Sequence, residues 1–146
     1  MSAKLCFWFA TLHSNFKSKQ EMTTSELEKL VNDYIDTWST TDSKHRQELV
    51  EKVYSQTAEF YAEEPGDEAV NHKGTDAIFG NISQVNDRLV VGNKLTTELT
   101  SYSLNHNSLK ISWQMITSNG NLVLKGMNFL QVDTSNKIEK DYIFIG

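Results

Sequence analysis

The chain has 146 residues, a length typical of one domain that buries about 68–70% of the surface its unfolded form exposes. Its hydrophobic fraction of 38% and charged fraction of 23% are typical of a globular protein and exclude a disordered, collagen-like or membrane-spanning chain. With 14 basic against 19 acidic residues, the chain would repel a phosphate backbone, and we expect no nucleic-acid partner.

The first 21 residues form an apolar and basic extension, which we separate from a single domain predicted over residues 22–146. The apolar run 5–12 resembles the start of a secretory signal, but it is too short to span a bilayer and no clear cleavage site follows it. The alternative is an extension that is disordered, packs on the domain, or arises from an upstream start codon, with Met22 as the true start. Cys6 is the single cysteine, which excludes an internal disulfide framework and fits a reducing cytoplasm.

Two helices are predicted at the start of the domain. Thr23-Thr-Ser-Glu26 has capping-box spacing, in which a Thr hydroxyl and a Glu carboxylate each satisfy a free backbone N–H of the first turn. The helix is expected to end near residues 39–41, and its buried stripe has a period near 3.6: Leu27, Leu30, Val31, Tyr34, Ile35 and Trp38. A second helix is expected from Asp42 or Ser43, with a buried stripe of Leu49, Val50, Val53 and Tyr54.

A strand and a third helix follow. Residues 58–61 are β-forming and predict a short strand, and Glu63-Glu-Pro-Gly-Asp67 interrupts the chain after it. The sequence Gly74-Thr-Asp76 predicts the start of the third helix. The apolar face of this helix is expected to contain Ile78, Ile82, Val85 and Leu89.

The rest of the chain predicts an antiparallel meander. Four β-rich runs are separated by turn-forming residues, at 95–105, 109–117, 122–132 and 138–145. Asn119-Gly120 is the strongest turn signal, since both residues tolerate the positive φ of a tight hairpin. Helices followed by such a meander predict an α+β fold.

The alternation within the strands predicts a dimer. Leu109, Ile111, Trp113 and Met115 share one face of their strand. The last strand is apolar on both sides, with Ile138, Tyr142 and Phe144 on one face and Ile143 and Ile145 on the other. Three helices can cover only one face of a curved sheet, so we expect a homodimer through the other face.

Taken together, residues 22–146 resemble the SnoaL-like polyketide cyclase family, within the wider group that shares the cone-shaped fold of nuclear transport factor two and ketosteroid isomerase. The order and spacing of several segments carry the resemblance: 30–42, 53–61, 74–78, 111–113, 126–129 and 137–138. The resemblance implies a cystatin-like α+β fold, in which three N-terminal helices pack on a curved, mostly antiparallel sheet. It also implies an apolar cavity in which acid–base chemistry acts on an enolisable or polycyclic ligand.

The resemblance implies catalytic roles for three positions. Tyr34 matches the first-helix position where ketosteroid isomerases place an oxyanion-hole tyrosine, and otherwise it packs on the apolar stripe. Glu64, before Pro65, matches the base of the isomerases by motif, with Glu63 as the alternative, although both can equally be solvated loop charges. Asn128 stands where cyclases and isomerases often place an aspartic acid. Since an amide cannot exchange a proton, this departure favours carbonyl binding over general acid catalysis.

The substrate-binding residues implied by the resemblance are Trp38, Phe60, Trp113 and Met115. The alternative for all four is that they fill the core and leave no cavity. No metal site is expected, because His13, His45, His72 and His106 lack ligand spacing.

Two functional hypotheses remain open. The first is a cofactor-independent isomerase, cyclase or dehydratase that acts on a hydrophobic carbonyl or hydroxyl compound. The second is a non-catalytic ligand-binding or dimerisation module with the same fold, with protein–protein scaffolding as a further possibility. Both place the chain in the cytoplasm with a hydrophobic small molecule, no cofactor and no membrane partner.

Overall fold

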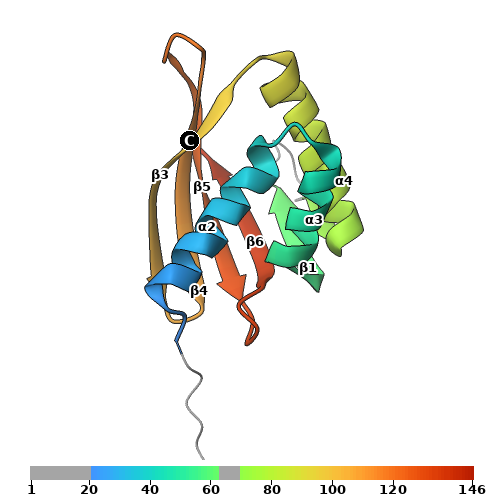
Figure 1. The fold of residues 1–146 in the computed structure, drawn as a ribbon, viewed down its shortest axis with the longest axis vertical. Coiled ribbons are helices and arrows are strands. Elements are labelled where there is room, and N and C mark those ends of the chain that lie inside the picture. The colour runs from blue at the N-terminus through green and yellow to red at the C-terminus, as the bar shows by residue number, and fades with distance from the viewer. Residues whose placement is uncertain (1–20, 63–69) are drawn as a thin grey trace, which may run out of the picture.

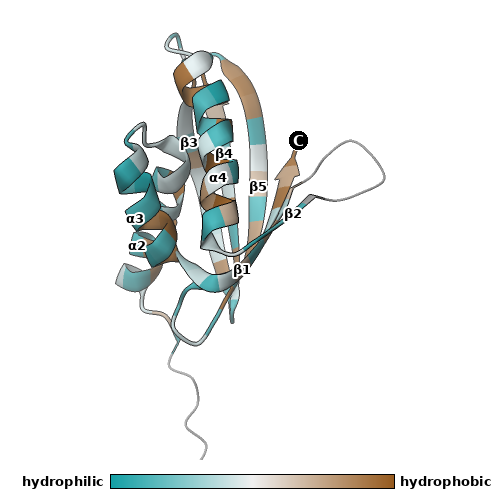
Figure 2. Ribbon diagram, turned by 90° about the vertical axis from the view of Figure 1, so that its right-hand side faces the viewer, coloured by the Kyte–Doolittle hydropathy of each residue, from teal (hydrophilic) through white to brown (hydrophobic). Residues whose placement is uncertain are grey.

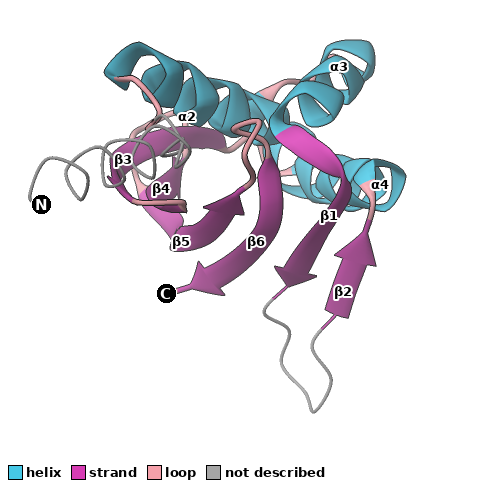
Figure 3. Ribbon diagram, turned by 90° about the horizontal axis from the view of Figure 1, so that it is seen from below, coloured by secondary structure: helices cyan, strands magenta, loops and turns pink. Residues whose placement is uncertain are grey.

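A computed structural model describes residues 21–62 and 70–146, in which helices cover one face of a curved β-sheet (Figures 1 and 3). The helices are α2 (Thr24–Ser39), α3 (Ser43–Val53), α4 (Thr75–Asn86) and the π-helical turn η1 (Asp87–Gly92). The strands are β1 (Tyr54–Ala62), β2 (Val70–Lys73), β3 (Thr96–Asn105), β4 (Ser108–Ile116), β5 (Leu122–Val132) and β6 (Ile138–Ile145). The predicted α+β class is confirmed. The proposed extension 1–21 lies, apart from Glu21, outside the described residues.

The helix starts follow the local chemistry of the sequence. At the start of α2, the Glu26 N–H donates to Thr23 Oγ1 over 3.1 Å and the Thr23 N–H donates to Glu26 Oε2 over 3.0 Å. The carboxylate of Asp42 caps α3 by accepting from the backbone N–H groups of Lys44 and His45. Before α4, Gly74 has a φ of +84°, a conformation that only glycine adopts at little cost. All three predicted starts are confirmed.

The sheet has the strand order β2-β1-β6-β5-β4-β3 and is antiparallel except where β1 pairs with β6. Two features of this sheet were not predicted from the sequence. Strand β1 starts at Tyr54, which the sequence placed on the preceding helix, and β2 is only four residues long and largely polar. Within the described residues, no helix is long and apolar enough to cross a membrane.

The inner face of the sheet packs against the helices. Leu109, Ile111, Trp113 and Met115 alternate along β4 and are all buried on this face, as predicted. The face assigned to Ile138 was wrong, because Ile138 is fully buried in the core whereas Phe144 is 49% exposed. The cause is a register shift opposite the start of β6, which interrupts the alternation between Ile138 and Lys140.

Candidate functional site

A carboxylate is completely buried on the inner face of the sheet. Asp141 in β6 has no exposed surface, and its partners in the sheet are Phe60 on β1 and Leu130 on β5. The register shift after Ile138 turns this side chain inward. A charge in such a position requires hydrogen-bond donors, because an unpaired buried charge is strongly destabilising.

Three side chains from three elements donate to this carboxylate. The hydroxyls of Tyr34 and Tyr54 donate to Asp141 Oδ2 over 3.0 and 2.7 Å, and Asn128 Nδ2 donates to Oδ1 over 2.7 Å. Tyr34 comes from the buried stripe of α2, Tyr54 from the first position of β1 and Asn128 from the inner face of β5. We call Tyr34, Tyr54, Asn128 and Asp141 the buried network.

The network shifts the ionisation of its own members. Burial raises the pKa of Asp141 from 3.8 to about 6, although the hydrogen bonds from Tyr54, Asn128 and Tyr34 oppose the shift. Burial and the nearby Asp141 carboxylate raise the pKa of both phenols well above 10. Near neutral pH the two tyrosines therefore remain protonated donors, while Asp141 changes its charge only slightly below that pH.

Trp113 holds Asn128 in a defined orientation. The Trp113 Nε1–H donates to Asn128 Oδ1 over 2.8 Å, which leaves the amide nitrogen for Asp141. The indole can lie there because residue 126, its cross-strand partner, is a glycine. A Cβ at Gly126 would come within 2.5 Å of the Trp113 ring.

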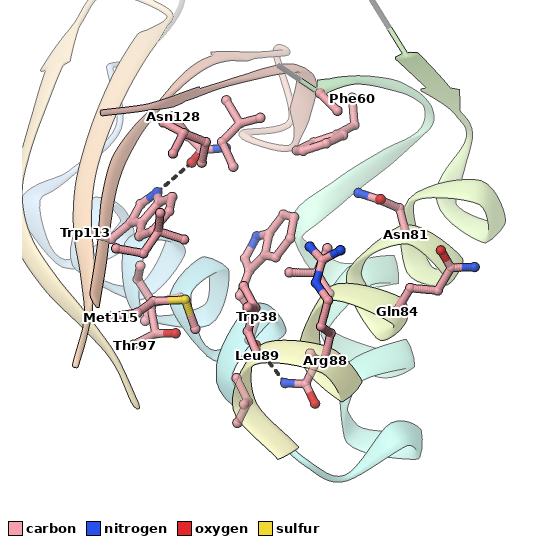
Figure 4. Close-up of a pocket in the computed structure, with 18 of the residues that line it drawn as sticks. Trp38, Phe60, Asn81, Gln84, Arg88, Leu89, Thr97, Trp113, Met115 and Asn128 are labelled. Carbon is pink, nitrogen blue, oxygen red and sulfur yellow. Dashed lines mark hydrogen bonds between the residues drawn. The ribbon is translucent and has the colours of Figure 1, made fainter. Parts of the chain in front are cut away.

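An apolar cavity of about 360 Å³ lies beside the buried network (Figure 4). Its volume is within the usual range for small-molecule sites. Apolar side chains form most of the wall, including all four predicted lining residues: Trp38, Phe60, Trp113 and Met115. Of the buried network, Tyr34 and Asn128 also line the cavity, whereas Asp141 and Tyr54 are not among its described lining residues.

Two buried polar atoms of cavity-lining residues form no hydrogen bond within the described part of the chain, Trp38 Nε1 and Asn86 Oδ1. The Trp38 indole also lies close enough to Tyr34 to oppose the rise in the pKa of that phenol. Figure 4 shows this indole between Trp113 and Phe60, at the centre of the drawn side chains. An unsatisfied buried donor costs about 1–3 kcal/mol, so an acceptor atom of a ligand would be stabilised at this position.

The structure brings together some of the predicted site residues and adds two. Tyr34 and Asn128 meet at one carboxylate, but Glu63 and Glu64 lie outside the described residues. Asp141 and Tyr54 were missed. The sequence did contain a sign of Asp141, because this residue alternates with Ile143 and Ile145 and so lies on the same face of β6. An acid on an apolar face is buried only when it is paired.

Comparisons with known proteins support the fold. No protein-family model matches the sequence, and no curated protein matches it. Among solved structures, a candidate isomerase of the SnoaL-like family from Agrobacterium tumefaciens is similar with a TM-score of 0.69 and 18% identity, over 82% of this chain and 96% of that one. A nuclear transport factor two-like protein of unknown function from Mesorhizobium loti has a TM-score of 0.64 and 12% identity, over 87% and 96% of the two chains.

A third similar structure is a de novo designed protein with a curved β-sheet. It has a TM-score of 0.64 and 13% identity, over 86% of this chain and 88% of that one. These comparisons confirm the SnoaL-like and nuclear transport factor two-like fold that the sequence resembles. At these identities they show the fold alone, because one fold hosts many activities.

Proposed function

We propose that the protein binds a hydrophobic carbonyl or hydroxyl compound in the cavity and promotes a proton transfer on it, as a cofactor-independent isomerase, cyclase or dehydratase does. One observation carries the proposal. Tyr34 and Asn128 line an apolar cavity and both donate to a buried carboxylate whose pKa is about 6. Perturbed acids beside apolar cavities are common at catalytic sites.

In this proposal Tyr34 is the contact with the ligand oxygen. Its phenol donates to Asp141 when that group is ionised. When Asp141 gains a proton, the carboxyl group itself becomes a donor, and the phenol can turn its proton toward a ligand oxygen. Charge that develops on the oxygen is then shared with a preorganised donor in a site of low polarity. Trp38 Nε1, which is buried beside Tyr34 and forms no hydrogen bond of normal geometry, supplies a second donor.

The proposed base comes from the segment after β1. Phe60 and Ala62 line the cavity, and Glu63 and Glu64 follow Ala62 directly in the sequence. One of the two carboxylates would accept the proton from carbon, with Glu64 as the first candidate. Tyr34 and Asn128 would act on the oxygen of the same ligand.

A matched pair of tyrosines tests the binding step. Para-nitrophenol presents an aromatic oxygen, and below the Asp141 pKa of about 6 we expect Tyr34→Phe to weaken its binding roughly tenfold, as the loss of one hydrogen bond predicts. Tyr54→Phe removes a hydroxyl that donates to the same Asp141 oxygen, but Tyr54 is not among the described cavity-lining residues. The affinity of this variant for para-nitrophenol should therefore stay near that of the wild type. Equal losses in the two variants would refute direct contact by Tyr34.

Isotope exchange tests the catalytic step. We expect the protein to accelerate deuterium exchange at the α-carbons of β-tetralone, an enolisable bicyclic ketone, in heavy water. Tyr34→Phe and Glu64→Gln should each slow that exchange, and Glu139→Gln, at an exposed position of β6, should leave it unchanged. Binding of the ketone without any accelerated exchange would exclude the catalytic proposal.

A non-catalytic binding module is the second candidate. It is favoured by the position of Asp141, which accepts three hydrogen bonds from the protein and is not among the described cavity-lining residues. In that case the buried network stabilises the fold, and Tyr34 and Asn128 bind a ligand without turnover. Binding of β-tetralone without accelerated deuterium exchange would support this candidate, since the two candidates share the same binding residues and differ only in turnover.

We also propose that two copies associate through the outer face of the sheet. This face is not covered by helices (Figure 2). Tyr61 stacks on Tyr142 with ring centroids 4.8 Å apart, and Phe129 lies 6.4 Å from Tyr142. Phe144 and Leu122 are 49% and 56% exposed, and such apolar exposure is typical of interaction surfaces. Native mass spectrometry should show a dimer that Phe144→Ser weakens, and a monomeric wild-type protein would contradict the proposal.

A further inference from the structure

The mouth of the cavity carries a positive charge that the proposed acid–base function does not use. Arg88 lies in η1 and is among the residues that line the cavity, yet its side chain is exposed to solvent. A residue that both lines a cavity and contacts solvent marks the opening of that cavity. Gln84 on α4 shares both properties, and Asn81, one turn earlier, is partly buried in the same wall.

Arg88 lies on the side of the helix that faces the cavity. Asn81, Gln84 and Arg88 recur at helical spacing along α4 and the π-helical turn that follows it, and all three line the cavity. The Asn93 N–H donates to the Arg88 carbonyl over 3.0 Å, a wide turn that continues α4 toward the sheet. Arg88, Leu89 and Val90 are consecutive and all line the cavity. Isolated π-helical turns are frequent at functional sites.

The chain contains two arginines, and they have different surroundings. Arg46 is only 3% exposed and donates to Ser83 Oγ and to the Thr40 carbonyl, so it ties α3 to its neighbouring helices. Arg88 forms no salt bridge within the described part of the chain. Figure 4 shows its guanidinium group directed into the cavity, on the side of Asn81.

We infer that the ligand is an amphipathic anion, with a carboxylate or similar acidic group at Arg88 and an apolar body against the aromatic wall. The inference rests on the proposal that the cavity binds a small molecule, and it names the class of that molecule. Guanidinium groups bind planar anions with two parallel hydrogen bonds, and the amides of Asn81 and Gln84 supply further donors beside it. Tyr34 and Asn128 also line the cavity and would receive an oxygen of the ligand, and Figure 4 shows Asn128 on the other side of the cavity from Arg88.

The charge of the whole chain means that an anionic ligand depends on a local cation such as Arg88. The net charge is −5, so an anion is repelled by the protein as a whole and needs a specific cation to bind. A ligand without charge would gain little from Arg88. A cation would face a guanidinium group at the opening of the cavity.

Two fluorescent probes that differ by one acidic group test the inference. Anilinonaphthalene sulfonate carries the anion, and N-phenyl-naphthylamine is the same ring system without it. Both become fluorescent in apolar cavities, and we expect them to compete for one site on the wild-type protein. Arg88→Gln should weaken binding of the sulfonate roughly fivefold to tenfold, the loss expected for one charge-assisted contact. Binding of the neutral probe should not change.

Two variants complete the test. Arg88→Lys keeps the charge but loses the planar guanidinium group. Its affinity for the sulfonate should lie between those of the wild type and Arg88→Gln, and its affinity for the neutral probe should not change. Lys44→Gln removes one positive charge from the exposed side of α3, outside the cavity wall, and should leave both affinities unchanged. Equal losses of both probes in Arg88→Gln, or equal sulfonate losses in Arg88→Gln and Lys44→Gln, would overturn the inference.

The outcomes also separate this inference from the proposed function. If the neutral probe binds and the sulfonate gains nothing from Arg88, the cavity proposal stands and the anion inference fails. If neither probe binds, or if the two do not compete, both fail. A sulfonate preference that depends on Arg88 supports the inference whether or not β-tetralone exchange is accelerated.

Discussion

The inner face of the sheet has two halves that differ in what fills them. In one half, Leu109, Leu130 and Ile138 are completely buried against α2 and α3. In the other, Trp113, Met115 and Leu124 surround a cavity of about 360 Å³. The same strands, β4 and β5, and the same helix, α2, contribute to both halves.

The buried network lies at the boundary between the halves. Along α2, Tyr34 separates the packed Leu30 and Val31 from the cavity-lining Trp38. Along β5, Asn128 stands between the packed Leu130 and the cavity-lining Leu124. A polar layer with its hydrogen bonds satisfied can border a cavity without collapse, because each member is held by partners on other elements. The cavity therefore exists because hydrogen-bonded side chains line its boundary, and not because this half of the sheet lacks apolar residues.

Two leucines provide the largest expected contrast between the halves. Leu109→Ala in the packed half should reduce the free energy of unfolding by about 2–5 kcal/mol, because it removes packed contacts and leaves a void. Leu124→Ala extends a cavity that already exists, and should cost about 1 kcal/mol. Urea denaturation measures both values, and similar losses would mean that the cavity half is packed as tightly as the other.

A methyl group at residue 126 should disturb the boundary from the cavity side. Gly126→Ala places a Cβ against the Trp113 ring and 2.7 Å from the Phe144 carbonyl oxygen, and should cost at least about 1–3 kcal/mol, as overpacking does. The indole must move away, which breaks its hydrogen bond to Asn128. The shift should appear as changed tryptophan fluorescence. Gly80→Ala is the matched control, since a Cβ there meets no atom within 4 Å. An unchanged spectrum in Gly126→Ala would contradict the proposed contact.

The pH dependence of stability tests how the buried network contributes to the free energy of unfolding. The pKa of Asp141 rises from 3.8 to about 6 on folding, so between these values the native state holds a proton that the unfolded state has lost. This group therefore adds stability at low pH, and the contribution is lost as pH rises through 6. Between pH 5 and pH 7 we expect a loss of about 1 kcal/mol in the free energy of unfolding.

The variant Asp141→Asn isolates that contribution. It keeps the size of the side chain and removes its ionisation, so the difference in stability between wild type and variant should depend on pH between 5 and 7. Urea denaturation at each pH gives both curves. Subtracting them removes the effects of Asp33 and Glu59, whose pKa values are lowered and which titrate below this window. A pH-independent difference would contradict a raised pKa.

The elements of the fold were predictable because their signals are local. The capping box at Thr23 and Glu26 and the period of the stripe that follows depend only on neighbouring residues. The hairpin between β4 and β5 also follows a local signal. Gly120 has a positive φ of 82°, as a tight turn requires, whereas Asn119 has a negative φ. Strand β2 was missed because its four residues have low β-propensity and are held in a strand only by pairing with β1.

The site was only partly predictable because it depends on long-range register. Tyr34 and Asn128 could be named from the resemblance. The sequence also shows that Asp141 shares a face with Ile143 and Ile145, but the register shift against β5 that places Ile138 on the same inner face is not visible in it. Periodicity also cannot distinguish a filled core from a cavity, so Trp38 and Phe60 fit both alternatives until the structure placed them. Glu63 and Glu64 remain predictions.

The ionisation of Asp141 is the most direct test of the account. Carbon-13 NMR of the side-chain carboxyl groups, with Asp141→Asn to assign the signal, should show a midpoint near pH 6 for Asp141 in the free protein. Saturation with para-nitrophenol should move that midpoint, because Tyr34 then shares its hydroxyl between the carboxylate and the ligand. A midpoint near the ordinary value of 3.8, unchanged by the ligand, would contradict a buried network that borders a functional cavity.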